Sequence, residues 1–438
     1  MKSALALYFS QERILEVTKM NDRSSAKKNV KLGPLGAEPP LFETAAMFQE
    51  SLHRFAEEEM RPVGMKLDRM TPEEVAAHDS PYWDVRRKFA ELGFGIETLL
   101  SFEPAERAKM MAIFFEELGW GDSGLAISFG AGMLPQYMCA ALGRQDLLEE
   151  FPDALLGCWG ITEPDHGSDS LDPNRMIFHS QGNYGRPNCI ATLKPGGNEI
   201  VINGQKSAWV SNGTIAKVCI LYCALDQGDG PSTERGCVVI VPMDAKGVSR
   251  GKPLDKIGQR ALNQGEVFFD NVRLPVRYLL AGADQFQDAV LAIHTAANGL
   301  MGAVFTGVAR AAYELALDYA HERKQGGVPI IRHQSVAYRL FHMFRKVEAS
   351  RALVNRVIHF NFGATPALHA AITAKITGTQ TSFEVASDAL QIFGGNGLTR
   401  EYPVEKLLRD ARASLIEDGC NEILAIKGGY YLIDGGRV

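Results

Sequence analysis

The chain has 438 residues, of which 46% are hydrophobic, and a formal net charge of -6. This length predicts about three domains, and this hydrophobic content is sufficient to build their cores. The acidic balance, with no dense Lys/Arg tract beyond the N-terminal segment, excludes nucleic-acid binding as the main function.

Residues 1–38 are expected to form a loosely ordered leader. Basic and hydroxyl residues in it allow a mitochondrial presequence as an alternative, but its acidic residues favour a bacterial, cytoplasmic chain. The basic and hydroxyl residues are Ser24, Ser25, Lys27 and Lys28, and the acidic residues are Glu12, Glu16 and Asp22. No window is expected to reach the roughly 18 to 20 uncharged apolar residues that a membrane-spanning helix needs.

Residues 39–156 predict an N-terminal helical domain. Between Leu41 and Glu149, apolar residues recur at the three- to four-residue spacing of helices that bury one face. The clearest examples are Phe42, Ala46, Phe48, Leu52 and Phe55, and later Met110, Ile113, Phe114 and Leu118.

Residues 157–277 predict a middle β domain, because the apolar period shortens to that of strands. Asn203-Gly204 and the Gly/Pro/Asp-rich segment 227–232 are interpreted as turns. Cys219 and Cys223 are expected to be small buried side chains, and the odd total of 7 cysteines favours a reducing compartment. The predicted strands are Glu199–Asn203, Val218–Cys223, Cys237–Val241 and Gly265–Asp270.

Residues 278–438 predict a C-terminal helical bundle, since helical spacing returns after Gln285. Thr365-Pro366 is interpreted as the N-cap and first residue of a helix that ends at Gly394-Gly395. The helix before it is expected to bury one face and to expose its basic residues. Its apolar residues are Leu340, Phe344, Val347, Val354 and Ile358, and its basic residues are Arg345, Lys346, Arg351 and Arg356.

Four short segments stand in a characteristic order: GITEPDHGSD at 160–169, NGQKSAWVSNG at 203–213, QIFGGNG with EYPVEK within 391–406, and RDA with DG within 409–419. Together they resemble the acyl-CoA dehydrogenases over roughly residues 40 to 435. The resemblance implies an α+β multidomain fold with a helical domain, a β-barrel-like middle domain and a C-terminal four-helix bundle. It also implies FAD as cofactor and a homotetramer or homodimer. We expect no protein-bound metal, because no metal-binding motif is present.

The resemblance assigns flavin contacts to residues of each segment. Trp159, Ile161 and Thr162 would line the flavin, and Ser168 would lie toward the pyrophosphate or the substrate's phosphopantetheine. Trp209 and Ser211, expected on one face of a strand, would meet the isoalloxazine, although one extra residue after Lys206 predicts a small bulge. Cys420 and Glu422 would lie near the ring, and the neighbouring subunit would supply Arg323, Gln391, Gly394 and Gly395 to the ADP part.

A base is required because the C–H next to a thioester is a very weak acid unless the developing enolate is stabilised. The resemblance implies that Asp418 is this base, at a position where the family usually has Glu. Glu417 is the rival carboxylate, and a purely structural role for both is a further alternative. Some relatives carry the base on a helix instead, but the matching residue here is Ala297. Asn298, Glu417, Gly419 and Ser168 would face the substrate.

Asp is shorter than Glu by one C–C bond of about 1.5 Å, and the resemblance links Asp here to alicyclic substrates. We therefore expect a bulky, cyclic or branched acyl-CoA or acyl-carrier thioester, with electrons passing to an electron-transferring flavoprotein. A nitroalkane-oxidase-like enzyme is one alternative. It would share Asp418 and the stretch 325–327, but its two partner positions hold Ala297 and Ala425. A catalytically silent flavin-binding protein is the other, and the long segment 170–188 is expected to cover the site or contact a partner.

Overall fold

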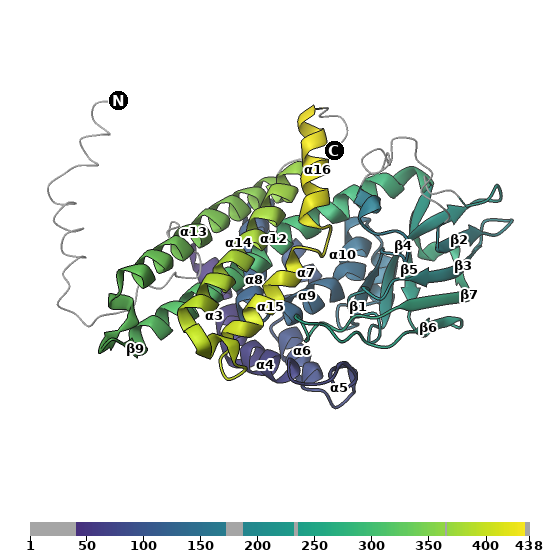
Figure 1. Cartoon of the computed structure of the whole chain (residues 1–438). Coiled ribbons are helices and arrows are strands. Elements are labelled where there is room, and N and C mark those ends of the chain that lie inside the picture. Colours follow the sequence, from purple (N-terminus) through teal and green to yellow (C-terminus); the bar gives the residue numbers. More distant parts are fainter. Residues whose placement is uncertain (1–40, 172–186, 232–234, 364–365, 434–438) are drawn as a thin grey trace, which may run out of the picture. The chain divides into compact units, whose positions relative to one another are not determined.

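The computed structural model describes residues 41–171, 187–231, 235–363 and 366–433. Within these ranges a helical block, a sheet and a second helical block follow one another along the chain (Figure 1). The expected leader, residues 1–38, and most of the 170–188 segment lie outside the described residues. The predicted succession of helical, strand and helical regions is confirmed.

Within the described residues, the first helical block contains nine short elements and one long central helix, α8. In α8, Met110, Ile113, Phe114 and Leu118 are buried as predicted. In α3, by contrast, Ala46 is exposed, and the buried face includes Ala45, Phe48 and Leu52. The elements are α3 (Glu43–Phe55), the π-helical η1 (Ala56–Met60), α4 (Arg61–Leu67), α5 (Pro72–Ala76), α6 (Pro81–Glu91), α7 (Ile96–Ser101), α8 (Pro104–Gly121), α9 (Ser123–Gly132), α10 (Leu134–Ala141) and α11 (Gln145–Glu150).

The middle region forms one sheet whose central strand, β4, is buried along nearly its whole length. The strand order is β6-β7-β3-β2-β4-β5-β8, and β1 pairs with β4 in parallel. Cys219 and Cys223 are buried in β4, as predicted. The strands are β1 (Gly157–Gly160), β2 (Cys189–Leu193), β3 (Glu199–Lys206), β4 (Val218–Asp226), β5 (Gly236–Pro242), β6 (Val248–Arg250), β7 (Val267–Pro275) and β8 (Leu279–Ala281).

The turn predicted at Asn203-Gly204 is wrong, because both residues lie inside β3. The pairing of β3 with β7 shifts register between Ile202 and Gly204, which marks a β-bulge. Gly204 has a φ of 118°, and a side chain there would collide with the carbonyl oxygen of Asn188. A glycine that signals a turn in sequence therefore bends a continuous strand instead.

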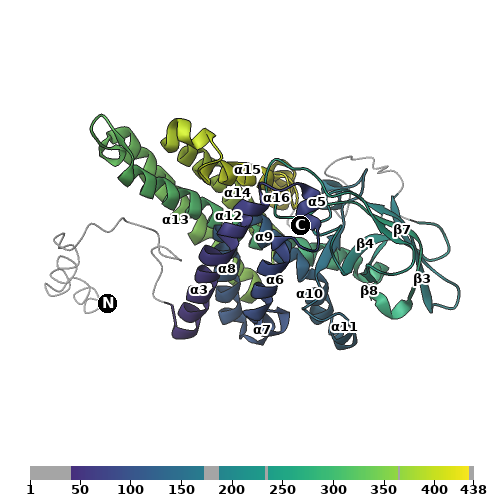
Figure 2. The ribbon, with the colours of Figure 1, turned by 90° about the horizontal axis from the view of Figure 1, so that it is seen from below.

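The second helical block packs long helices against α8 and against one another (Figure 2). The predicted N-cap of its third long helix is wrong: α14 begins at Leu368 after Ala367, and Pro366 precedes the cap. Thr365 lies outside the described residues. The elements are α12 (Ala283–Glu322), the hairpin β9 (Lys324–Gln325) and β10 (Val328–Pro329), α13 (Gln334–Gly363), α14 (Leu368–Phe393), the 3-10 turn η5 (Gly394–Leu398), α15 (Val404–Ser414) and α16 (Asn421–Ile433).

A charged cluster lies in the core between α8, α12 and α13. Arg310 donates to Glu116 at 2.8 Å and to Glu117 at 2.7 Å, and Arg351 reaches Glu116 at 2.9 Å. The prediction that Arg351 faces solvent is wrong, since its side chain is only 2% exposed. A long arginine on an apolar helix face is stable there because buried carboxylates compensate its charge.

Helix α12 runs from beside β5 and β8 to the far end of the bundle. By length and composition alone it could cross a membrane, so the expectation that no such apolar window exists is wrong. However, 72% of its most apolar window is buried inside the structure. Its apolar character is therefore explained by its central place in the helical core.

Candidate active site

The predicted base, Asp418, lies in the short loop between α15 and α16. Its φ of 52° is left-handed, a conformation that costs free energy for a residue other than glycine. The amide of Asn298 in α12 donates to the carbonyl oxygen of Asp418 at 3.2 Å. The N–H of Asn421 closes the loop on the carbonyl of Leu415 at 3.0 Å. Hydrogen bonds from two helices thus hold Asp418 in a strained conformation.

Lys375, a fully buried residue of α14, is the main support of this loop. Its ammonium donates to the carbonyl oxygens of Ser414 at 2.9 Å and Gly419 at 2.8 Å, and to the side chain of Asn421 at 2.8 Å. Burial lowers the pKa of Lys375 to about 8, although the carboxylates of Glu417, Asp418 and Glu422 oppose that shift. The ammonium is therefore both a clamp on the backbone and a positive charge close to Asp418.

The two neighbouring carboxyl groups, Glu417 and Asp418, both have raised pKa values. Burial raises the pKa of Asp418, and the charge of Lys375 partly opposes it. Burial and then the charge of Asp418 raise the pKa of Glu417 to about 7. A carboxylate with a raised pKa is a better base than a free one.

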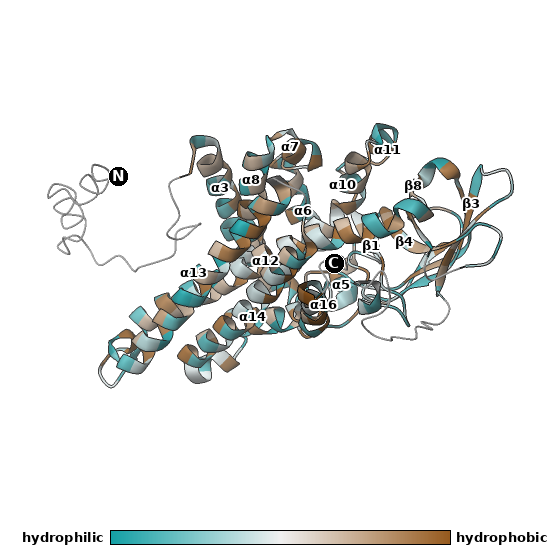
Figure 3. Ribbon diagram, turned by 90° about the horizontal axis from the view of Figure 1, so that it is seen from above, coloured by the Kyte–Doolittle hydropathy of each residue, from teal (hydrophilic) through white to brown (hydrophobic). Residues whose placement is uncertain are grey.

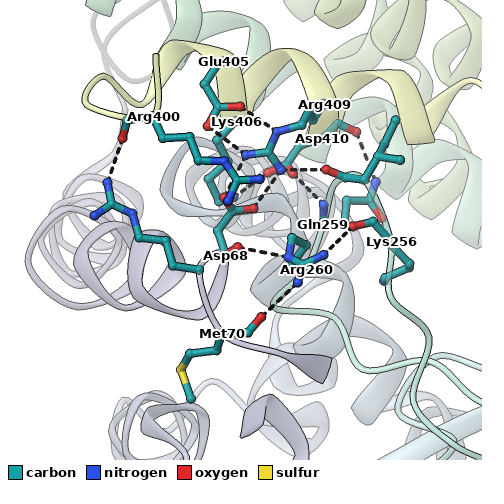
Figure 4. Close-up of polar contacts among 12 residues, drawn as sticks. Asp68, Met70, Lys256, Gln259, Arg260, Arg400, Glu405, Lys406, Arg409 and Asp410 are labelled. Carbon is teal, nitrogen blue, oxygen red and sulfur yellow. Dashed lines mark hydrogen bonds and ion pairs between the residues drawn. The ribbon is translucent and has the colours of Figure 1, made fainter. Parts of the chain in front are cut away.

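Gln259 contacts both Glu417 and a junction of the three regions. Figure 4 shows the junction, with Gln259 close to Lys406 and Asp410. Its side chain donates to Glu417 at 2.6 Å, and its backbone N–H donates to Asp410 at 2.5 Å. Asp410 also accepts from Lys406, which reaches Asp122 of the first helical block at 2.7 Å. The position of Glu417 is thereby tied to how the helical blocks and the sheet region pack.

A cleft of about 490 Å³ lies beside the segment that follows β1. The indole of Trp209 is 59% exposed at this cleft, and an exposed aromatic face is a stacking surface for a planar ring. Asp169 orders the turn opposite, because its carboxylate accepts from the N–H of Gly167 at 2.6 Å. These features fit the ring and polar chain of a flavin. The lining includes Thr162, Glu163, Pro164, Gly167, Ser207 and Trp209.

A buried ion pair supports the wall of this cleft. Lys206 donates to Glu163 at 2.6 Å and to the carbonyl oxygen of Ile161 at 3.2 Å. The N–H of Ser207 donates to the carbonyl of Thr162 at 2.9 Å. Strand β3 therefore fixes the backbone of 161–163, so that the Thr162 side chain remains partly accessible.

The strand predicted for Trp209 and Ser211 is wrong. Trp209 lies in a turn after β3, and Ser211 forms only an isolated bridge with Gln264. The amide of Gln264 nevertheless joins them, since it donates to the Trp209 carbonyl at 3.3 Å and the Ser211 hydroxyl at 3.4 Å. The extra residue after Lys206 is accommodated by this turn, and Val210 between them is buried.

The residues predicted to contact the ADP part of FAD lie at the other end of α12. Arg323 directly follows its last residue, and η5 packs there because Tyr319 stacks on Phe393 at 3.9 Å. Because α12 has 40 residues, its ends are about 60 Å apart. One chain therefore does not bring its ADP-contact residues to its own cleft. Exposed at this end are Arg323, Gln391, Gly394 and Gly395.

The remaining predicted residues surround the base loop and the cleft. Cys420 and Gly419 are partly buried in the loop, and Glu422 is exposed in the first turn of α16. Ser168 begins the 3-10 turn η2 (Ser168–Leu171) and is partly buried. Trp159 lies in β1 beside His294 of α12, with ring centroids 5.7 Å apart.

Sequence reasoning did not identify Lys375, Gln259 or His294. Two of them carried a signal: Lys375 stands among apolar residues on the buried side of α14, and His294 does so in α12. A polar residue on an apolar helix face indicates a specific partner or a function. Gln259 lies in an irregular loop, where no periodicity distinguishes it.

The fold and the site define a flavoprotein oxidoreductase with helical N- and C-terminal regions and a middle sheet. A family model described as the acyl-CoA dehydrogenase middle domain matches residues 158–272, and one for the acyl-CoA dehydrogenase C-terminal domain matches residues 295–427. The chain belongs to the acyl-CoA dehydrogenase family.

Similar proteins support this assignment over most of the chain. The benzylmalonyl-CoA dehydrogenase of Aromatoleum aromaticum is 30% identical over 86% of this chain and 95% of its own length. The short-chain specific acyl-CoA dehydrogenase of Clostridium acetobutylicum is 28% identical over 87% of this chain and 96% of its own. The solved butyryl-CoA dehydrogenase of Megasphaera elsdenii superposes with a TM-score of 0.76 at 25% identity, covering 90% of this chain and 100% of that one.

Proposed function

We propose that this chain catalyses the FAD-dependent α,β-dehydrogenation of a bulky acyl-CoA thioester and that Asp418 takes the α-proton. The observation that carries the proposal is the loop of Asp418. It holds a non-glycine residue at a φ of 52° between hydrogen bonds from α12 and α14. Strain maintained by surrounding contacts is typical of active-site residues.

Several groups give Asp418 the properties of a base. Burial raises the pKa of its carboxyl, while the positive charge of Lys375 partly opposes this rise and favours the ionised form. Asn298 holds its carbonyl oxygen. The N–H of Asp418 donates to no backbone carbonyl within the described ranges, so it is available for the thioester oxygen. FAD bound in the cleft would accept the hydride from the β-carbon.

Two observations support a bulky acyl group. The shorter Asp side chain requires the reacting carbon to approach the loop by about 1.5 Å more than a Glu would. In addition, a 30% identical relative is named for benzylmalonyl-CoA, a thioester with a benzyl group. The proposal covers an acyl-carrier thioester as well as a CoA thioester. An electron-transferring flavoprotein is the proposed acceptor.

A second copy of the chain completes the proposed cofactor site. Arg323 and η5 lie about 60 Å along α12 from its sheet end, so they would serve the cleft of a neighbour. Large apolar side chains are exposed near this end, including Tyr338 at 69% and Leu398 at 76%. Helix α16, brown in Figure 3, also exposes Leu432 at 85%. Exposed apolar surface of this kind is typical of subunit interfaces.

The test is anaerobic reduction of the bound flavin by a series of acyl-CoA thioesters ordered by size around the α-carbon. We expect a bulky or cyclic thioester to bleach the flavin fastest. Asp418→Asn should slow this reduction about 10³-fold, because general-base catalysis contributes typically 10²- to 10⁴-fold. The matched control is Asp244→Asn, since Asp244 is an exposed carboxylate of the sheet region.

The proposal fails if no thioester reduces the flavin, or if Asp418→Asn and Asp244→Asn behave alike with equal flavin content. A preference for unbranched butyryl-CoA would contradict only the part of the proposal that assigns a bulky substrate. Oxygen consumption with nitroethane would indicate a nitroalkane oxidase instead.

A further inference from the structure

Among the residues that the structure describes, a group of neighbouring buried polar atoms has no hydrogen-bond partner, and one of its members, Asn298, contacts the base loop. They are both ring nitrogens of His294, the indole nitrogen of Trp159 and the amide oxygen of Asn298. His294 is 5% exposed and Asn298 is fully buried. Because they are four residues apart in α12, both side chains lie on the same helix face.

This group connects the proposed base with the wall of the flavin cleft. Asn298 donates to the carbonyl oxygen of Asp418 at 3.2 Å, and the Trp159 ring lies 5.7 Å from that of His294. Trp159 is in β1, the strand that leads directly to Thr162 at the cleft. An acyl group whose α-carbon is within reach of Asp418 would therefore pass next to these atoms.

We infer that His294, Trp159 and Asn298 form a polar subsite for a hydroxyl group on the acyl part of the substrate. The inference rests on the proposed function and narrows its substrate class. Native proteins leave few buried polar groups unpaired, and each exception calls for an explanation, such as a functional role or a bound partner. A ligand that supplies the missing partners would make these atoms favourable rather than costly.

The chemistry of the atoms selects a hydroxyl over a carboxylate. The indole of Trp159 can only donate a hydrogen bond, and the amide oxygen of Asn298 can only accept one. The amide nitrogen of Asn298 already donates to Asp418, so only its oxygen is left for a ligand. Burial, with the nearby charge of Lys427, lowers the pKa of His294 to about 3, so its ring is neutral and offers one donor and one acceptor. A hydroxyl both donates and accepts, while a carboxylate would be repelled by the Asn298 oxygen.

The test compares cyclohexanecarboxyl-CoA with 4-hydroxycyclohexanecarboxyl-CoA and cyclohexane-1,4-dicarboxylic acid mono-CoA thioester. The dissociation constant and the rate of anaerobic flavin reduction are measured for each with the wild type and with His294→Phe. We expect the wild type to bind the hydroxylated thioester on the order of tenfold more tightly than the plain ring. His294→Phe should abolish that preference, with binding of the plain ring unchanged or improved.

Trp159→Phe is the second variant, because it removes only the indole N–H and keeps an aromatic ring. It should reduce the same preference severalfold. Thermal denaturation gives an independent readout: His294→Phe should be at least as stable as the wild type, since it removes unpaired buried polar atoms. His78→Phe in the first helical block is the matched control and should leave the preference intact.

An equal affinity of the wild type for the plain and hydroxylated rings, unchanged in both variants, would overturn the inference while leaving the dehydrogenase proposal standing. A preference for the dicarboxylic thioester would also overturn it in favour of an anionic substrate. If none of these or other thioesters reduces the flavin, the dehydrogenase proposal fails, and the subsite proposal fails with it.

Discussion

Two buried charged regions of this molecule have opposite electrostatic character. In the cluster around Arg310, the charged forms of the central pair are reinforced: the pKa of Arg310 is raised by Glu117, and that of Glu117 is lowered to about 2 by Arg310 and His53. Around Asp418 the charged forms are weakened, because burial lowers the pKa of Lys375 and raises that of Glu417.

The difference lies in what the charges are paired with. Arg310 contacts carboxylates directly, at 2.8 Å and 2.7 Å, so their negative charges outweigh the effect of burial and raise its pKa. Lys375 instead donates to two backbone carbonyls and one amide oxygen, which provide no negative charge. Ion pairs stabilise a core, whereas buried charged groups with neutral partners have pKa values closer to neutral pH and exchange protons more readily.

The largest effect should come from the Arg310 cluster. Arg310→Met leaves Glu117 without its main cationic partner and leaves Glu116 paired with Arg351 alone. Breaking a buried ion pair in this way costs about 3 to 5 kcal/mol. Chemical denaturation should show this loss, while flavin reduction per bound flavin should stay near wild type. A loss below about 1 kcal/mol would mean that the cluster is not a stabilising centre.

Lys375→Met should lower the rate of flavin reduction more than it lowers stability. The loop loses three hydrogen bonds from the ammonium, and we expect flavin reduction to slow about 30-fold, equivalent to about 2 kcal/mol. The same change removes a positive charge that lowers the pKa of Asp418, so the acid limb of the rate profile should move to higher pH. Lys346→Met is the control, because Lys346 of α13 forms a partly exposed ion pair with Glu384 of α14. An unshifted limb would contradict the assigned role.

Glu417→Gln should change how stability depends on pH. The folded-state pKa of Glu417 is raised from 4.5 to about 7, so between these values the folded protein keeps a proton that the unfolded chain has released. Wild-type stability therefore falls as pH rises through this window. The glutamine variant lacks this loss, and its advantage should grow by about 2 to 3 kcal/mol from pH 4.5 to pH 7. Denaturation curves at several pH values measure it; a constant difference would disprove it.

The smallest effect should come from an exposed pair. Arg54 reaches Glu50 at 3.1 Å, but both side chains are more than half exposed, so water and salt screen the interaction. Arg54→Ala should cost no more than about 0.5 kcal/mol in the same denaturation experiment. A cost comparable to that of Arg310→Met would show that burial does not separate the two classes of ion pair.

Sequence patterns predicted what depends on local periodicity and composition. The succession of regions, the buried face of α8 and the strand of Cys219 and Cys223 are of this kind. The predictions were wrong where contacts between residues distant in sequence determine the structure. Arg351 is buried because Glu116 is nearby, and Gly204 is a bulge because the Asn188 backbone approaches it. Neither partner is close in sequence.

For the site, too, the sequence predicted the local part and not the contacts between distant residues. The motif around Asp418 was recognisable as a continuous segment, because its residues are neighbours in the chain. Lys375, Asn298 and Gln259 come from separate elements, and only the packed structure brings them to one loop. Resemblance supplied the reacting residue, whereas the residues that hold it follow from the three-dimensional contacts.

Helix α12 has a consequence for how this protein tolerates change over evolution. Asn298 contacts the base loop, and Tyr319 fixes η5 through its stacking on Phe393 and a 2.9 Å hydrogen bond from Asn396. Inserting one residue between them would rotate the later contacts by about 100° relative to the earlier ones. Substitutions in α12 that keep the core packed are compatible with both contacts, but a change in the number of residues from Asn298 to Tyr319 is not.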